Sequence, residues 1–266
     1  MPTFKSEGLV IKREDFAEYN RIYTIYTREY GKISCVAEGV RKIKSKQAGH
    51  LEPFTHVQCM FALGRSHRNK LATAVTVNAF SKIRQDFLVI ALAHYCLELV
   101  DSAVMEEEKD EFIFDLLIEI FSFLDMNTQR SVHEAVLSVR VFGFKLLSHL
   151  GYKPELLSCL GCQGIITDDH VVFHTLRGGL FEERCLDEKF DPYMLRINRE
   201  MIISLSLLLE QGIDHLSALY FETNTIIQLN QILKKYLEIH LERSMKTDFW
   251  LETMFQSKNT FDDRPL

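Results

Sequence analysis

The sequence contains none of the short motifs that mark the common enzyme classes. It has no glycine-rich phosphate loop, no Gly-x-Gly-x-x-Gly dinucleotide signature, no Gly-x-Ser-x-Gly nucleophile elbow and no His-Glu-x-x-His zinc-protease motif. Nothing in the sequence nominates a nucleophile together with its base. We therefore expect a protein that is not an enzyme.

Long apolar runs are also missing. The longest nearly apolar stretch, Phe87 to Val100, is too short to span a bilayer and contains His94 and Glu98. Residues 1–15 carry charges where a signal peptide needs an apolar segment. We expect a cytoplasmic protein whose six cysteines stay reduced, so that a Cys-x-x-Cys pair favours a metal over a disulfide.

Charge is divided unevenly along the 266 residues, although the net charge is only −6. Residues 1–84 contain fifteen Lys and Arg against seven Asp and Glu, whereas the remainder contains sixteen against thirty. A basic segment followed by an acidic one indicates an end that binds anions and an end that binds partners or nothing. The alternative is that solvated surface charges cluster without a function.

The periodicity of apolar residues changes from that of strands to that of helices near residue 84, where the charge balance also changes. Short runs rich in β-branched and aromatic residues predict five strands, at about 8–11, 21–27, 32–37, 54–63 and 71–77. They leave no room for a crossover helix, so a closed or nearly closed antiparallel barrel is expected. Apolar residues at three- and four-residue spacing then predict helices at about 87–99, 112–124, 132–150, 200–210 and 225–243.

The expected fold class is therefore α+β. We predict a barrel of the OB type at residues 1–80 and a mostly helical domain at 81–250. An irregular, cysteine-containing knuckle is expected inside the second domain at about 156–190. Residues 251–266 are polar towards their end and are expected to form a flexible tail.

Basic residues gather in the predicted loops and strand ends of the barrel, where they can follow a phosphate backbone. They are Lys12, Arg13, Arg41, Lys42, Lys44, Lys46, Arg65, Arg68 and Lys70. OB-type barrels bind single strands across one face, with aromatic side chains under the bases. The candidate stacking residues are Tyr19, Tyr23, Tyr26, Tyr30 and Phe61, of which Tyr23 and Phe61 are more typical of core side chains.

Cys159 and Cys162 form a Cys-x-x-Cys turn, which is half of a common tetrahedral zinc site. Cys185 follows further along, but Glu188 stands where a second Cys-x-x-Cys pair would end. Three thiolates and the Glu188 carboxylate are one possible ligand set, and His170 or His174 is an alternative fourth ligand. A knuckle that has lost its metal and folds on its core alone explains the pattern nearly as well.

A series of segments resembles the RecO family of bacterial DNA-repair and recombination proteins, in order from about residue 4 to 247. The segments are Glu7–Arg13, Asn20–Ile33, Ala37–Lys42, Gly49–Phe54, Leu150–Leu156 leading into Cys159-x-x-Cys162, and Tyr236–Lys246. The N-terminal segments are the most specific.

The resemblance implies an N-terminal OB fold, a helical C-terminal domain and, in many members, a zinc knuckle with four cysteines. Arg13, Arg21, Arg41 and Lys42 fall on the basic barrel positions of the family. Three cysteines match zinc ligands, and Glu188 departs from the fourth. The family's role is to bind single- and double-stranded DNA, to anneal complementary strands, and to act with RecR in loading RecA onto DNA coated by single-stranded DNA-binding protein. The acidic tail of that coating protein docks on the helical domain, and no membrane is involved. A place at the nucleoid is implied.

Two rival hypotheses stay open at this point. The protein can be an adaptor whose main ligand is another protein, with an OB-type module for RNA or DNA outside recombination. A zinc enzyme with an open coordination position depends only on the incomplete cysteine set.

Overall fold

The computed structural model describes residues 3–63, 69–126, 131–186 and 191–259. The chain packs as two compact units, residues 1–128 and residues 129–266. Among the described helices, none combines the length and the apolar character needed to cross a membrane.

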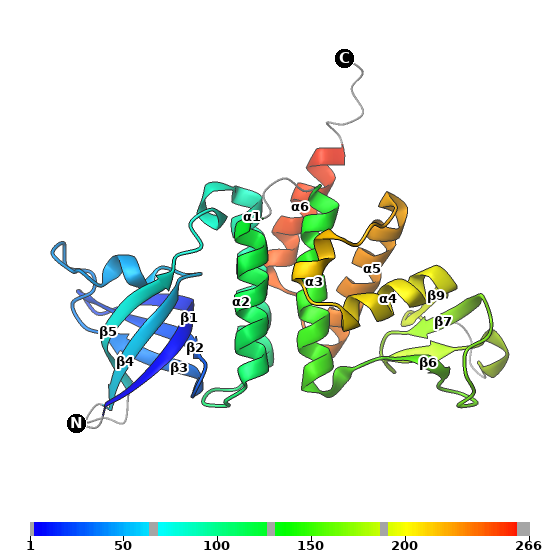
Figure 1. Cartoon of the computed structure of the whole chain (residues 1–266), viewed down its shortest axis with the longest axis horizontal. Coiled ribbons are helices and arrows are strands. Elements are labelled where there is room, and N and C mark those ends of the chain that lie inside the picture. The colour runs from blue at the N-terminus through cyan, green and yellow to red at the C-terminus, as the bar shows by residue number, and fades with distance from the viewer. Residues whose placement is uncertain (1–2, 64–68, 127–130, 187–190, 260–266) are drawn as a thin grey trace, which may run out of the picture. The chain divides into compact units, whose positions relative to one another are not determined.

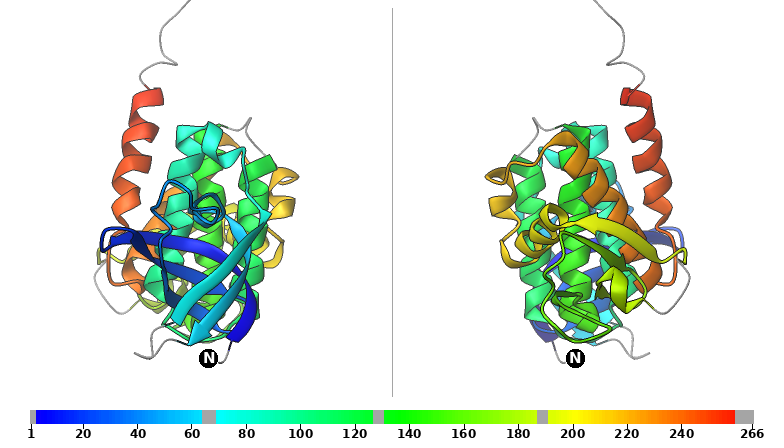
Figure 2. Two further views of the ribbon diagram at one scale, coloured as in Figure 1. Left: turned by 90° about the vertical axis from the view of Figure 1, so that its left-hand side faces the viewer. Right: turned by 90° about the vertical axis from the view of Figure 1, so that its right-hand side faces the viewer.

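The first unit contains a closed barrel of five strands in the order β1-β2-β3-β5-β4 (Figure 1). The strands are β1 Thr3–Phe16, β2 Asn20–Thr27, β3 Gly31–Ala37, β4 His56–Leu63 and β5 Asn69–Asn78. Pairing of β1 with β4 closes the barrel, while β3 and β5 pair in parallel at only two positions. The left view of Figure 2 looks onto these strands. This topology confirms the expected OB-type barrel.

Alternation along the strands produces the barrel core. Val10, Tyr23, Ile25 and Phe61 have no exposed surface, because every second side chain of a closed barrel points inward. The buried Tyr23 therefore belongs to the core.

Two helices, α1 Phe87–Ala103 and α2 Glu111–Met126, pack against the barrel. α1 begins after Asp86, whose carboxylate accepts hydrogen bonds from the first free backbone N–H groups of the helix. The Phe54 ring lies 4.7 Å from the His94 ring of α1 and 6.0 Å from the Phe121 ring of α2, measured between centroids. The helices thus cover one end of the barrel's outer surface.

The segment between these helices lies close to the start of β3, where glycine is required. Gly31 has a φ of +65°, and a Cβ there would lie 2.1 Å from the carbonyl oxygen of Glu108. Only glycine tolerates both conditions at low energy. The segment between α1 and α2, which contains Glu106, Glu107 and Glu108, can therefore approach the barrel this closely because residue 31 is glycine. We call this segment the acidic segment.

The second unit places helices on one small sheet of order β6-β8-β7-β9. The strands are β6 Glu155–Cys159, β7 His170–His174, β8 Gly179–Phe181 and β9 Met194–Asn198, and the helices are α3 Val132–Leu147, α4 Arg199–Glu210, α5 Thr223–His240 and α6 Lys246–Asn259. Phe144, Phe173 and Tyr236 meet in its core. The region 156–190, expected to be irregular, contains most of this sheet. Its strands have only three to five residues, too few for a clear periodicity.

The C-terminal segment begins as a helix. Residues 251–266 were predicted to form a flexible tail, but α6 continues to Asn259, and residues 260–266 lie outside the described part. The helix is anchored by buried Leu251 and by Asp248, whose carboxylate lies 3.7 Å from the Arg140 guanidinium with both side chains 6% exposed. The predicted division into domains 1–80 and 81–250 stays a prediction; in the structure α1 and α2 belong to the same compact unit as the barrel.

Candidate nucleic-acid interface and metal centre

Several of the predicted phosphate-binding cations of the barrel are in surface ion pairs. The pairs are Lys12 with Glu14, Arg13 with Glu52, Arg21 and Arg41 with Asp15, and Lys70 with Glu38. The Arg21 guanidinium donates to Asp15 and holds the pKa of that carboxyl below its usual value. Exposed pairs of this kind contribute about 0–1 kcal/mol each, so a phosphate can open them, but each carboxylate offsets a positive charge.

The loop after β3 carries three of the predicted phosphate-binding lysines. Lys42, Lys44 and Lys46 are exposed, and in the part of the chain that the structure describes no ion pair includes them. In Figure 1 this loop extends in light blue from the upper edge of the barrel. Arg65 and Arg68, predicted to contact phosphate, lie outside the described residues.

Of the candidate stacking residues, only two are accessible. Tyr23, Tyr26 and Phe61 have no exposed surface and cannot stack on a base, whereas Tyr19 is 46% and Tyr30 41% exposed. The period-two pattern could not exclude Tyr26, which faces outward from β2 and donates its hydroxyl to the carbonyl oxygen of Asp110 at 3.2 Å. Burial under this segment raises its pKa.

The three cysteines of the knuckle come together in space. Cys159 ends β6, Cys162 lies in the turn that follows, and Cys185 lies in the short helix after β8. Together with Glu182 they present four ligand atoms that all lie within 4.8 Å of one another. Gly161 permits this approach, because a Cβ there would lie 2.8 Å from the Cβ of Cys185.

Glu182 is the ligand candidate that the sequence pattern missed. Glu188 lies outside the described residues, and the described His170 and His174 are not members of the cluster. The signal was the Gly178-Gly179 turn, after which β8 runs beside β6 and returns the chain to Cys159. The turn and the strand together bring the residue just after β8 to the thiols.

The ionisation of the cluster suits a cation. Burial opposes ionisation of Cys159, but backbone N–H groups of Cys162, Glu182 and Gly161 directed at its sulfur outweigh this and lower the pKa of the thiol. The pKa of Cys185 is raised to about 11. The largest cause is its hydrogen bond with Cys162, and burial and a hydrogen bond with Cys159 add to it. Ionisation is thus favoured at Cys159 and disfavoured at Cys185, and a divalent metal would stabilise the thiolate form of both.

The donor set fits zinc, which takes thiolate and carboxylate ligands in tetrahedral sites. Glu182 is already oriented, since Arg184 donates to its Oε2 at 2.6 Å and Thr167 donates to its Oε1 at 3.3 Å. The Arg184 hydrogen bond lowers the pKa of the Glu182 carboxyl. Zinc held here would fasten the turn after β6 to the helix after β8.

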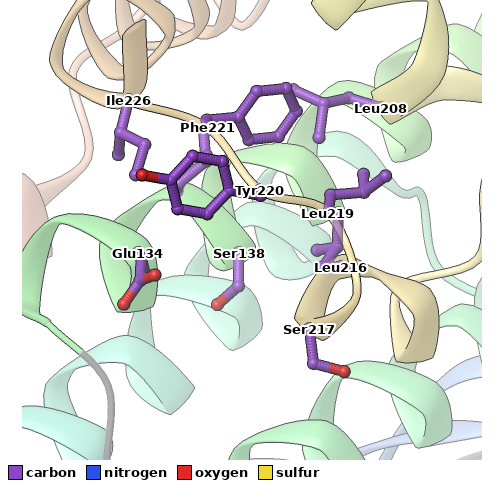
Figure 3. Close-up of a pocket in the computed structure, with 10 residues that line it drawn as sticks. Glu134, Ser138, Leu208, Leu216, Ser217, Leu219, Tyr220, Phe221 and Ile226 are labelled. Atoms are coloured by element: carbon purple, nitrogen blue, oxygen red, sulfur yellow. The ribbon is translucent and has the colours of Figure 1, made fainter. Parts of the chain in front are cut away.

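A pocket of about 240 Å³ lies in the second unit, between α3, α4 and the loop that precedes α5 (Figure 3). The Tyr220 and Phe221 rings lie on one side of it and Glu134 and Ser138 of α3 on the other. None of its described lining residues is basic.

Comparison with known proteins agrees with this architecture over nearly the whole chain. Residues 1–80 match the family described as Recombination protein O N terminal, and residues 84–248 match the one described as Recombination protein O C terminal. The chain belongs to the RecO family. Membership of the RecO family places it among DNA repair and recombination proteins, as the sequence resemblance indicated.

The chain is also similar to curated DNA repair proteins along most of their length. The DNA repair protein RecO of Roseiflexus sp. (strain RS-1) is 29% identical over 257 residues, covering 97% of this chain and 88% of that protein. The DNA repair protein RecO of Halalkalibacterium halodurans is 26% identical over 250 residues, covering 94% of each. That of Alkaliphilus metalliredigens is 29% identical over 245 residues, covering 90% of this chain and 94% of the relative.

Proposed function

We propose that this protein is a non-catalytic mediator of recombinational repair. It binds single- and double-stranded DNA, anneals complementary strands, and acts with RecR to load RecA onto DNA coated by single-stranded DNA-binding protein. The observation that carries the proposal is a closed OB-type barrel, in a chain of the RecO family, with a loop whose lysines form no ion pair among the described residues.

The barrel supports DNA binding through charge. Lys42, Lys44 and Lys46 are exposed on one loop. When lysines bind DNA phosphates, the counterions condensed on the DNA are released, so binding weakens as the salt concentration rises. The ion-paired cations Lys12, Arg13, Arg21, Arg41 and Lys70 can join once a phosphate displaces their carboxylates, and Arg65 and Arg68 belong to the proposed interface as well.

The second unit supports partner binding less specifically. The charged residue among the described residues lining its pocket is Glu134, so an acidic peptide would meet a like charge there. We therefore do not assign that pocket to the acidic tail of single-stranded DNA-binding protein. Zinc on Cys159, Cys162, Cys185 and Glu182 has a structural role in the proposal, holding the knuckle on the sheet.

Fluorescence anisotropy with a labelled single strand and the matching duplex, across a salt series, tests the DNA-binding proposal. We expect binding to both, with affinity falling linearly in log–log form as salt rises. Affinity that is independent of salt would contradict an interface dominated by phosphate contacts.

A further inference from the structure

The face across which OB-type barrels usually bind single strands is partly occupied by this chain itself. At one end of the outer surface of β2 and β3, the Tyr26 hydroxyl donates to the carbonyl oxygen of Asp110. The backbone N–H of Glu107 donates to the carbonyl oxygen of Lys32 at 2.9 Å. The segment between α1 and α2 therefore lies where a nucleic acid would otherwise cross.

The open remainder of that face carries negative charge. A hollow of about 320 Å³ there is lined by Ile22, Ser34 and Val36 of the two strands and by Glu106 and Glu107. Phosphates would be repelled by the two carboxylates, and among the described residues that line this hollow none is aromatic. A single strand must find its stacking surface elsewhere on the barrel.

An exposed aromatic residue lies at the end of the barrel where β1 turns into β2. Tyr19 is 46% exposed, and the Lys42 ammonium lies 5.5 Å from the centroid of its ring. Phe16 is 38% exposed beside the turn, and Ile43 next to Lys42 is fully exposed. We call residues 16–19 together with residues 41–46 the tip surface.

The backbone holds the two loops of the tip surface together. The N–H of Arg41 donates to the carbonyl oxygen of Tyr19 at 3.0 Å, and the N–H of Gly39 donates to the side-chain oxygen of Asn20 at 2.8 Å. The Arg41 guanidinium also donates to the carbonyl oxygen of Ala17 at 3.3 Å. Tyr19 is thus presented on a fixed backbone next to lysines that are free of described ion pairs.

This combination fits an unpaired nucleobase with its phosphate. An aromatic ring stacks on any base, and the lysines on the same surface reach the backbone charge on either side. A duplex hides its base faces within the helix, so the ring adds affinity only for single strands, whereas the lysines attract both.

We propose that Tyr19 stacks on a base of bound single-stranded DNA and so adds affinity for single strands that duplex DNA does not gain. This inference rests on the proposed DNA-binding function and names the residue that distinguishes between its two ligands. The tip surface is separate from the β2–β3 face, which the acidic segment between α1 and α2 partly covers.

The test compares Tyr19→Ala, Tyr19→Phe and wild-type protein on three probes. The probes are a single-stranded oligonucleotide, the same sugar–phosphate backbone with abasic sites in place of its nucleotides, and the duplex. We expect Tyr19→Ala to weaken binding to the single strand by about 10-fold while leaving binding to the abasic strand and to the duplex unchanged. Tyr19→Phe, which keeps the ring, should bind all three as wild type does.

Equal weakening on all three probes, or on none, would overturn the role of Tyr19. A wild-type protein that binds none of the probes would instead refute the DNA-binding function itself. Photocross-linking of wild-type protein to a single strand containing 5-iodouracil gives a test without a variant. A cross-link at Tyr19 is expected, and a cross-link confined to β2 and β3 would contradict the proposal.

Discussion

Removing the three lysines of the tip surface should change the salt dependence of single-strand binding by an amount that can be stated in advance. In the variant Lys42→Ala, Lys44→Ala and Lys46→Ala, three cations without described ion pairs are lost from an exposed loop. Each contact to a phosphate of a single strand contributes about 0.7 to the slope of log affinity against log salt. The slope should therefore become shallower by about 2, which corresponds to a loss of roughly 100-fold at 0.1 M salt that fades towards 1 M.

The assay is fluorescence anisotropy of a labelled single strand from 50 mM to 500 mM salt, with the thermal unfolding midpoint as a check on folding. A charge-matched control replaces Lys5, Lys82 and Lys153, which are also exposed and lie outside the tip surface. The control should keep a slope close to that of wild-type protein. If both triple variants lose the same slope, binding depends on overall charge, and the reasoning from the tip surface is wrong.

Three further outcomes follow from the structure. Glu182→Gln should lower the zinc content of purified protein, measured by mass spectrometry of the metal, whereas Glu188→Gln should leave it unchanged; the reverse result would give Glu188 the fourth position. Asp248→Ala leaves the Arg140 guanidinium buried without its counter-charge, so urea denaturation should show a loss of about 3–5 kcal/mol, and a loss below about 1 kcal/mol would mean that α6 adds little to the fold. Burial lowers the pKa of His56 below its unfolded value of 6.5. The unfolded chain therefore takes up a proton first, and the stability of the protein falls as pH drops below about 6.5. His56→Gln should reduce this loss of stability, and an unchanged profile of stability against pH would contradict the assignment.

The barrel was predictable because its strands follow the elementary rule of a half-buried sheet. β-branched and aromatic residues alternate in β2 and β3, and the same alternation places Tyr23 inside. The burial of Tyr26 was not predictable from that rule, because it depends on a segment more than 80 residues away in sequence. Alternation determines which face of a strand a residue occupies, and only tertiary packing determines whether that face meets solvent.

The metal centre was half visible for a related reason. A Cys-x-x-Cys turn is a local signal, so Cys159 and Cys162 could be paired from spacing alone. The contribution of Glu182 depends on β8 lying beside β6, a pairing between strands of three and five residues that carry no usable periodicity. Short strands brought together by glycine turns place ligands that spacing rules do not find.

Strand annealing on protein-coated DNA requires DNA binding, the partner and the activity at once, so it is the decisive assay for the proposed function. Complementary single strands are first coated with the cognate single-stranded DNA-binding protein, and duplex formation is followed by energy transfer between end labels. We expect the wild-type protein to accelerate annealing and the variant lacking Lys42, Lys44 and Lys46 to do so much less at 0.1 M salt. Annealing no faster than in the absence of the protein would contradict the proposed function.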